Sequence, residues 1–293
     1  DGVFDGGSRA AMGVDESTEE DINTYKVHFE YRFNDDILAH ALASSGYRAG
    51  GFNRSGFGSV SAASPYESDT LWNYEVGVRT SWLDNRLTAN AVAYYIDWSD
   101  IQLGTYDPET VSSKIQNVGE AEIYGLETEV RYQVTDNLRL SANYSYIDAS
   151  LAEDFLDSVV DRSTTPPTAT EFVAAPEGTR LPGSSKDTFS LSADWQGTLT
   201  DSLDMLANVN YLYTGSRAAF LTTAASSGVE DTPSSEFVNL SIGVRHDNGV
   251  TVSLYANNLF DERAIQRRRA IGLLEAVTVS RPRMIGLRAG YQF

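Results

Sequence analysis

The last eleven residues of the chain, 283–293, alternate between two kinds of side chain. Every second position is apolar: Ile285, Leu287, Ala289, Tyr291 and Phe293. The residues between them are mostly small, polar or charged. A period of two predicts a β-strand with two different faces. The pattern runs to an aromatic last residue without a tail, which favours a sheet that closes with its final strand.

The same alternation recurs along the chain and predicts about eleven strands over residues 22–293. Short turns, mostly with Asp or Asn, join these strands in pairs, near residues 35, 85, 136, 201 and 248. Five long connections separate the pairs, and we expect them to be loops: Ala49–Asp69, Ser99–Val118, Leu151–Gly183, Gly215–Ser234 and Asp261–Ser280. Residues 1–21 are Gly-rich and acidic, and they predict a further outer loop.

The alternation of short and long connections distinguishes two all-β architectures. A soluble β-sandwich and a membrane barrel can share the same two-faced strands, because only the solvent of each face differs. Short turns at one end and long loops at the other are inherent in an outer-membrane barrel. Aromatic residues also gather near strand ends, as in interfacial belts: Trp72, Trp82, Trp98, Tyr144, Tyr146, Tyr211, Tyr213 and Tyr291. We therefore predict an antiparallel up-and-down transmembrane β-barrel.

Composition excludes several other classes of protein. The net charge of −19 disfavours nucleic acid as a partner. The absence of cysteine excludes a disulfide framework and thiolate metal sites. The sequence also lacks the nucleophile-elbow, phosphate-loop and dinucleotide-binding motifs, so we expect no enzyme activity and no cofactor.

The odd number of strands carries a further expectation. In an up-and-down sheet of eleven strands, the first and last strands run in the same direction. Closing such a sheet needs a parallel seam, which bacterial single-chain barrels avoid. We therefore expect the earlier strands of the barrel to lie outside this sequence, and the last strand to have an unpaired edge or an improvised partner.

Three segments resemble the carboxy-terminal half of TonB-dependent outer-membrane receptors. Residues Asn257–Glu262 resemble the family's Asn-Leu-Phe-Asp element before the last outer loop. Residues Trp72–Leu87 are similar to its Tyr-Glu-x-Gly hairpin, and Asn117–Glu129 to its Asn-x-Gly…Gly-x-Glu strand. The aromatic residues Tyr291 and Phe293 match its terminal signal, although Arg288 stands where a glycine is expected.

The resemblance implies a fold and a function. Barrels of this family have 22 strands around a plug, so this chain corresponds to strands 12–22 without the plug. The family takes up scarce ligands across the outer membrane, most often ferric siderophores. The resemblance also implies partners: the TonB complex through an amino-terminal part outside this chain, the barrel-assembly machinery, and lipopolysaccharide and other outer-membrane lipid. A passive porin-like channel and a soluble β-sandwich binding domain are the alternative functions.

Ligand capture is expected at the outer loops, where Arg and aromatic side chains suit binding of an anionic ligand, such as a ferric siderophore or a carboxylate. The candidates are Arg267, Arg268, Arg269, Arg217, Phe220, Tyr66 and Tyr106. Contact with lipopolysaccharide phosphates is an alternative explanation for the three consecutive arginines. His28 and His40 flank one turn and are expected near each other, without forming a metal site. Arg79, Glu127 and Arg131 are expected to form ion pairs along the barrel interior.

Overall fold

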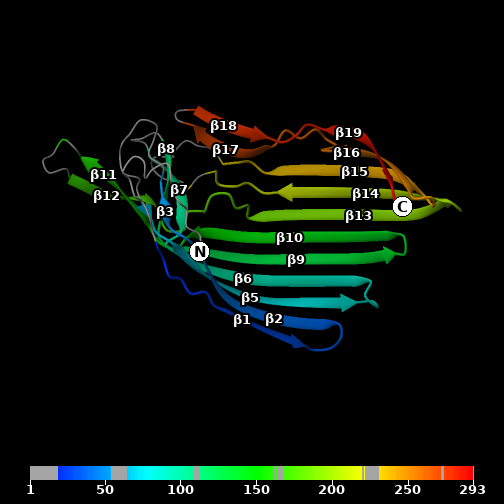
Figure 1. Ribbon diagram of the computed structural model, residues 1–293, viewed down its shortest axis with the longest axis horizontal. Coiled ribbons are helices and arrows are strands. Elements are labelled where there is room, and N and C mark those ends of the chain that lie inside the picture. The colour runs from blue at the N-terminus through cyan, green and yellow to red at the C-terminus, as the bar shows by residue number, and fades with distance from the viewer. Residues whose placement is uncertain are drawn as a thin grey trace.

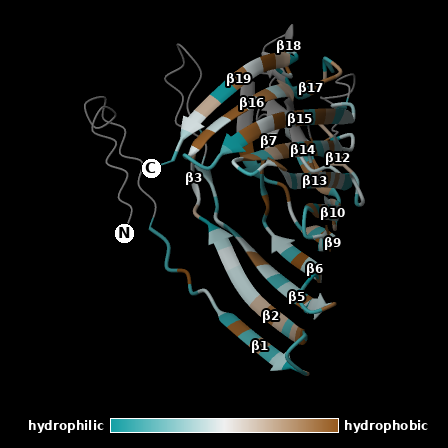
Figure 2. Cartoon of the chain, turned by 90° about the vertical axis from the view of Figure 1, so that its right-hand side faces the viewer, coloured by the Kyte–Doolittle hydropathy of each residue, from teal (hydrophilic) through white to brown (hydrophobic). Residues whose placement is uncertain are grey.

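The computed structural model describes residues 19–53, 65–107, 112–161, 163, 168–219, 221, 231–271 and 274–292. Eleven strands form one antiparallel sheet in which each strand pairs with its neighbours in chain order. Short turns join the strands at one end, and the longer connections lie at the other (Figure 1). Viewed from the turn end, the strands follow an open arc from β1 to β19 (Figure 2). Both the predicted fold and the expected number of strands are confirmed.

The sheet consists of β1 (Lys26–Arg32), β2 (Ile37–Arg48), β5 (Asp69–Trp82), β6 (Leu87–Ser99), β9 (Ala121–Thr135), β10 (Leu138–Leu151), β13 (Asp187–Thr200), β14 (Leu203–Thr214), β15 (Ser235–His246), β16 (Val250–Asn257) and β19 (Met284–Tyr291). The edge strands β1 and β19 are not paired with each other in the described structure. The last strand of the sheet, β19, pairs only with β16 among the described strands, so the expected unpaired edge is present. The described residues include no helix long and apolar enough to span a bilayer.

The prediction that the long connections are plain loops is wrong for four of them. They contain two-stranded antiparallel sheets: β3 (Gly51–Phe52) with β4 (Pro65–Tyr66), β7 (Gln102–Asp107) with β8 (Ser112–Asn117), β11 (Phe155–Asp161) with β12 (Thr168–Ala175), and β17 (Ile265–Ile271) with β18 (Leu274–Val279). Strands of two to eight residues are too short for a clear period, and polar residues interrupt them. The fifth connection contributes single bridges at Arg217, to Ser185 and to Thr232.

One face of the sheet leaves large apolar side chains exposed. On β1 the exposed fractions are 69% for Val27 and 65% for Phe29, and on β19 they are 65% for Ile285 and 76% for Leu287. Soluble monomeric proteins rarely expose apolar side chains in this way over a whole sheet face. The outward face therefore requires lipid as its solvent, whereas the opposite face carries the polar residues of each strand.

Aromatic side chains bound this face at both ends. At the loop end of the first strands, rings contact one another in succession from Tyr25 through Trp72, Tyr74 and Tyr95 to Tyr124, with centroid separations between 4.9 and 6.4 Å. The last pair is tilted and the others are stacked. Trp82 lies at the turn end of β5, ten residues beyond Trp72. Ten residues span about 34 Å along a strand, or about 26 Å at a tilt of roughly 40°. This agrees with an apolar band of about 25 Å in such barrels.

Trp98 is an exception to the predicted belt. Its neighbour Tyr95 faces lipid with Tyr74 and Tyr124, so Trp98 lies on the opposite face. There it packs against a buried apolar cluster beneath the outer loops. Sequence position identified a strand end correctly, but it did not distinguish the two faces.

The predicted interior ion pairs are only partly present. Arg131 forms an ion pair with Glu129 of its own strand. Neither Arg79 nor Glu127 has an ion-pair partner within the described residues. Register explains the difference, because Arg79 lies opposite Leu38 and Asn90 rather than opposite a carboxylate.

Glycines on the inner face make room for rings from neighbouring strands. The Tyr94 ring lies over Gly125, so a Cβ at position 125 would come within 2.0 Å of the Tyr94 Cζ. The His40 ring covers Gly77, and Tyr255 covers Gly286, in the same way. A ring packed on a cross-strand glycine fixes the local register and shields the bare backbone.

Replacing Gly125 with alanine is expected to destabilise the barrel by about 1–3 kcal/mol, because the Tyr94 ring must leave its position. Tyr94→Ala should relieve the clash, so the double variant should lose less than the two single variants summed. Urea unfolding of the refolded protein in detergent measures all three variants. Simple additivity of the losses would contradict the packing.

Candidate ligand-binding surface at the outer loops

The buried apolar core of the described residues lies at the outer-loop end of the sheet. One cluster joins residues that flank β7 and β8, the loop ends of β9 and β10, the β11–β12 hairpin and the segment after β14. Its members are Ile101, Val118, Ala121, Ala149, Leu151, Phe155, Ala174, Ala175, Leu181 and Leu221. The barrel strands have one sheet layer between lipid and lumen, so only the loops can bury apolar groups on several sides. The cluster fixes three connections to one another.

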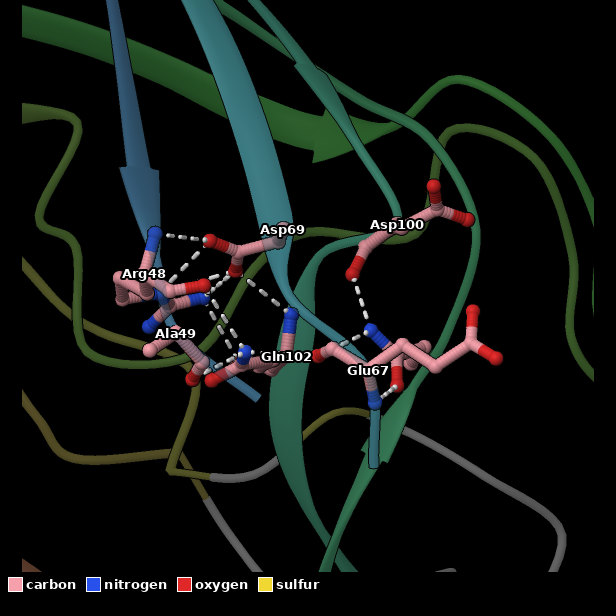
Figure 3. A network of polar contacts seen from close by, with 7 residues as sticks. Arg48, Ala49, Glu67, Asp69, Asp100 and Gln102 are labelled. Atoms are coloured by element: carbon pink, nitrogen blue, oxygen red, sulfur yellow. Dashed lines mark hydrogen bonds and ion pairs between the residues drawn. The ribbon is translucent and has the colours of Figure 1, made fainter. Parts of the chain in front are cut away.

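A buried carboxylate, Asp69, holds the base of the first two outer hairpins (Figure 3). Asp69 is 1% exposed and begins β5. Its oxygens accept hydrogen bonds from the backbone N–H and the guanidinium of Arg48 and, at 3.0 Å, from the backbone N–H of Gln102. The Arg48 guanidinium also lies 4.7 Å from the Trp98 ring centroid. The carboxylate thus connects the end of β2 and the start of β5 to the start of β7.

Three side-chain amides continue this connection. The Gln102 amide donates to the backbone oxygens of Ala49 and Glu67, at 3.1 and 2.8 Å. Asn117 accepts from the backbone N–H of Glu67 and donates to its carbonyl. Asn53 makes the same two-bond exchange with Ile115. Each side-chain amide bonds backbone groups of the other hairpin, as a neighbouring strand would do. The β3–β4 and β7–β8 hairpins therefore form one hydrogen-bonded unit.

Burial raises the pKa of Asp69, but the hydrogen bonds from Arg48 and Gln102 and the Arg48 charge outweigh burial, and the pKa lies below its ordinary value. The ionised carboxylate therefore stabilises the loops fully above the ordinary pKa, about 3.9. That stabilisation is lost as the pH falls below this value through the folded-state pKa.

We expect amide hydrogens of Gln102 and its neighbours to remain protected at about pH 5 and to lose protection below about pH 3.5. Hydrogen exchange with mass spectrometry at several pH values, corrected for intrinsic rates, measures this. Protection that rises on acidification would contradict the assigned ion pair.

The last outer loop has its own polar base at Asn258. This side chain is 6% exposed, and its amide donates to the carbonyls of Glu262 and Arg281, both at 2.9 Å. Its oxygen accepts from the Glu262 N–H at 2.8 Å. Asp261 accepts from the Arg283 N–H at 2.7 Å. Asn258 and Asp261 both have positive φ, 53° and 57°, so the element from Asn258 to Asp261 is a tight turn that closes the loop.

The structure brings two of the candidate ligand-binding segments together. The Arg217 guanidinium donates to the backbone carbonyl of Gln266 at 2.8 Å. Gln266 directly precedes Arg267, which is exposed, and Arg268, which is half-buried, in β17. Arg269 belongs to the same strand. The hydrogen bond therefore places Arg217 against the backbone of β17, next to the segment that carries Arg267 and Arg268.

The aromatic candidates lie in other hairpins. Tyr66 forms part of β4, and its ring covers Gly51 of β3. Tyr106 lies in β7. Phe220 and Phe293 lie outside the described residues. Tyr291 is 61% exposed at the end of β19, on the lipid-facing side of the sheet with Leu287.

His28 and His40 lie near each other, as expected, with ring centroids 6.1 Å apart. The Nε2 atom of His28 is 3.7 Å from a Glu30 oxygen. In the described part of the chain, no group of three or more His, Cys, Asp or Glu side chains is arranged to hold a metal ion.

Sequence reasoning missed the residues that hold the loops in place. Asp69 and Gln102 have no motif around them, and Asn117 belonged to a recognised strand element that did not indicate its hydrogen-bonding role. The partners of all three lie 15 or more residues away. Asn258 belonged to a recognised element, but its role as a buried hydrogen-bonding centre was not predicted. Buried polar residues in long connections are visible only after the hairpins are placed.

Comparisons with known proteins agree with this architecture. Residues 3–259 match the family model described as TonB dependent receptor-like, beta-barrel. The metal-pseudopaline receptor CntO of Pseudomonas aeruginosa is 27% identical over 246 residues, which cover 83% of this chain and 30% of CntO. The probable TonB-dependent siderophore receptor PiuA of Acinetobacter baumannii is 30% identical over 90 residues, 31% of this chain and 11% of PiuA.

Among solved structures, the ferric yersiniabactin uptake receptor FyuA of Yersinia pestis superposes with a TM-score of 0.69 at 18% identity. The match covers 90% of this chain and 36% of FyuA. The chain belongs to the TonB-dependent receptor family and forms part of its β-barrel. Its location is the bacterial outer membrane, and the relatives are receptors rather than enzymes. The chain spans about a third of the length of the relatives CntO and FyuA.

Proposed function

We propose that the chain supplies barrel wall and outer loops to a receptor that imports a scarce ligand, a ferric siderophore, with energy from the TonB complex. The observation that carries the proposal is the arginine surface made by Arg217 and the β17–β18 hairpin, held by the hydrogen bond from Arg217 to Gln266. Guanidinium groups bind the carboxylate and catecholate oxygens of iron chelates through charge-assisted hydrogen bonds. The names of CntO, PiuA and FyuA, each a receptor for a metal chelate or siderophore, support the same ligand class.

In this proposal the outer loops capture the ligand and the barrel acts as a rigid wall. Contact with the ligand falls to Arg267, Arg268, Arg269, Arg217, Phe220, Tyr66 and Tyr106. We assign residues 22–293 to the barrel and residues 1–21 to a further outer loop, of which residues 1–18 lie outside the described part of the chain. Contact with TonB falls to a part of the receptor outside this sequence. Tyr291 and Phe293 form the signal for the barrel-assembly machinery. Outer-membrane lipid, including lipopolysaccharide, surrounds the apolar face.

The test uses the protein expressed from its complete gene in a strain that lacks its other siderophore receptors. The probes are radioactive iron complexed with a catecholate siderophore and with a carboxylate siderophore. We expect Arg217→Ala and Arg267→Ala each to weaken binding of one probe by roughly ten- to a hundredfold. Arg263→Ala is the matched control, because Arg263 lies in the same loop but pairs with Asp261.

Uptake should stop when TonB is deleted, while binding remains. Uptake that persists without TonB would favour a passive porin-like channel. If both arginine variants bind both probes normally, the arginine surface is not the capture site, and contact with lipopolysaccharide becomes the better explanation.

A further inference from the structure

The lipid-facing side of the sheet contains one almost wholly apolar hollow, of about 530 Å³, across β9, β10, β13 and β14. Its position follows from the register. One row across the strands reads Tyr132, Leu140, Ala193 and Val209, and the next reads Val130, Ala142, Leu191 and Tyr211. Two alanines in diagonal positions form the floor, and larger side chains surround them.

Bulky residues also close the hollow along the strands. The row toward the outer loops contains Tyr144 opposite Phe189, and the row toward the turns contains Leu138 opposite Trp195. Tyr144 belongs to the aromatic region at the loop end, where its hydroxyl donates to Asp187 at 2.7 Å. The hollow therefore lies on the lipid-facing side of the sheet between these two rows, with Tyr211 of the predicted belt at its loop side.

We propose that this hollow binds one acyl chain of a bilayer lipid as a specific site on the barrel surface. The lipid-facing side is dry, so only an apolar occupant avoids the cost of leaving polar groups unsatisfied. A chain lying over Ala142 and Ala193 gains contact with Leu140, Leu191, Tyr132 and Tyr211 on its sides as well as with the floor. Contact on several sides increases dispersion attraction relative to the more uniform surface of neighbouring strands. The volume lies within the usual range for ligand sites, about 300–1,000 Å³.

The site differs from the arginine surface in position and chemistry, and it does not depend on which ligand the receptor imports. A lipid-binding site would explain why two alanines lie diagonally among large apolar neighbours. Exposure to the membrane alone does not explain this pattern. Lipid exposure requires only apolar side chains of any size.

The experiment uses the full-length protein in vesicles of phosphatidylethanolamine and phosphatidylglycerol that carry a photoreactive diazirine at mid-chain. After irradiation, adducts are located by peptide mass spectrometry. Adducts should concentrate on peptides containing Leu140–Ala142 and Leu191–Ala193. Ala193→Leu should reduce these adducts roughly tenfold, because the new side chain displaces about two methylenes of the lipid chain.

Ala142→Leu is a second filling variant, and heat-modifiable migration in gels shows whether each variant is folded. Ala93→Leu is the matched control, because Ala93 lies on the lipid face of β6, beside Val76 and Leu126 and outside the hollow. Equal adduct yields at the hollow in the parent, Ala193→Leu and Ala142→Leu proteins would overturn the proposal. Cross-links between two copies of the protein at the hollow would overturn it too, in favour of a protein contact.

Discussion

Replacing Asp69 with alanine is expected to open the first two outer hairpins while leaving the barrel folded. The variant removes the acceptor for Arg48 and for the Gln102 N–H, and it leaves that N–H without its buried partner. We expect a loss of about 2–4 kcal/mol in the local opening free energy, below the value for a fully buried pair because Arg48 is half exposed. Hydrogen exchange across β3, β4, β7 and β8 measures the loss.

Two variants separate charge from shape at this position. Asp69→Asn retains an oxygen that can accept from Gln102 but removes the ion pair, so its effect should be intermediate. Glu67→Ala is the control, because Glu67 joins the network through its backbone alone. If Asp69→Ala and Glu67→Ala give the same exchange pattern, Asp69 does not hold the hairpins.

Replacing Asn258 with alanine is the second large effect. The change removes three hydrogen bonds and leaves the Glu262 and Arg281 carbonyls and the Glu262 N–H without that partner. It also places a residue other than Asn or Gly at a φ of 53°. Together these terms predict a loss of about 3–5 kcal/mol for the last outer loop, measured by exchange of β17 and β18 amides.

Asn258→Gly isolates the hydrogen bonds, since glycine adopts positive φ without cost. It should recover about 1–2 kcal/mol relative to alanine. Asn257→Ala is the matched control, because Asn257 directly precedes Asn258 but its side chain is exposed at the end of β16. An Asn258→Ala variant with parental exchange in β17 and β18 would show that another contact closes this loop.

The sheet could be predicted from the sequence because each strand carries its own signal. Alternation at Val27, Phe29 and Tyr31, or at Ile285 and Leu287, is local and does not depend on distant partners. Turn residues then fix which strands pair. The order of the sheet followed, because consecutive strands in an up-and-down barrel are neighbours.

The outer loops could not be predicted in the same way. The contact from Gln102 to Glu67 spans 35 residues, and the bridge from Asn53 to Ile115 spans 62. Such contacts depend on the β3–β4 and β7–β8 hairpins packing together, and no local pattern records them. The arginines of β17 were identified as a candidate surface, yet the hydrogen bond that brings Arg217 beside them spans 49 residues. Trp98 was assigned to the wrong environment for a related reason, since its face depends on register.

The central claim is that the chain forms barrel wall with its long hairpins outside the cell. Labelling of single introduced cysteines in intact cells tests this claim most directly. These 293 residues contain no cysteine, and any cysteine elsewhere in the complete protein is replaced by serine, so that each introduced thiol reports one position. In the protein expressed from its complete gene, a membrane-impermeant maleimide should label Arg267→Cys in intact cells. Asn137→Cys, in the β9–β10 turn, should react only after the outer membrane is permeabilised. Labelling of Asn137→Cys but not Arg267→Cys in intact cells would contradict the orientation and the outer-loop capture surface derived from it.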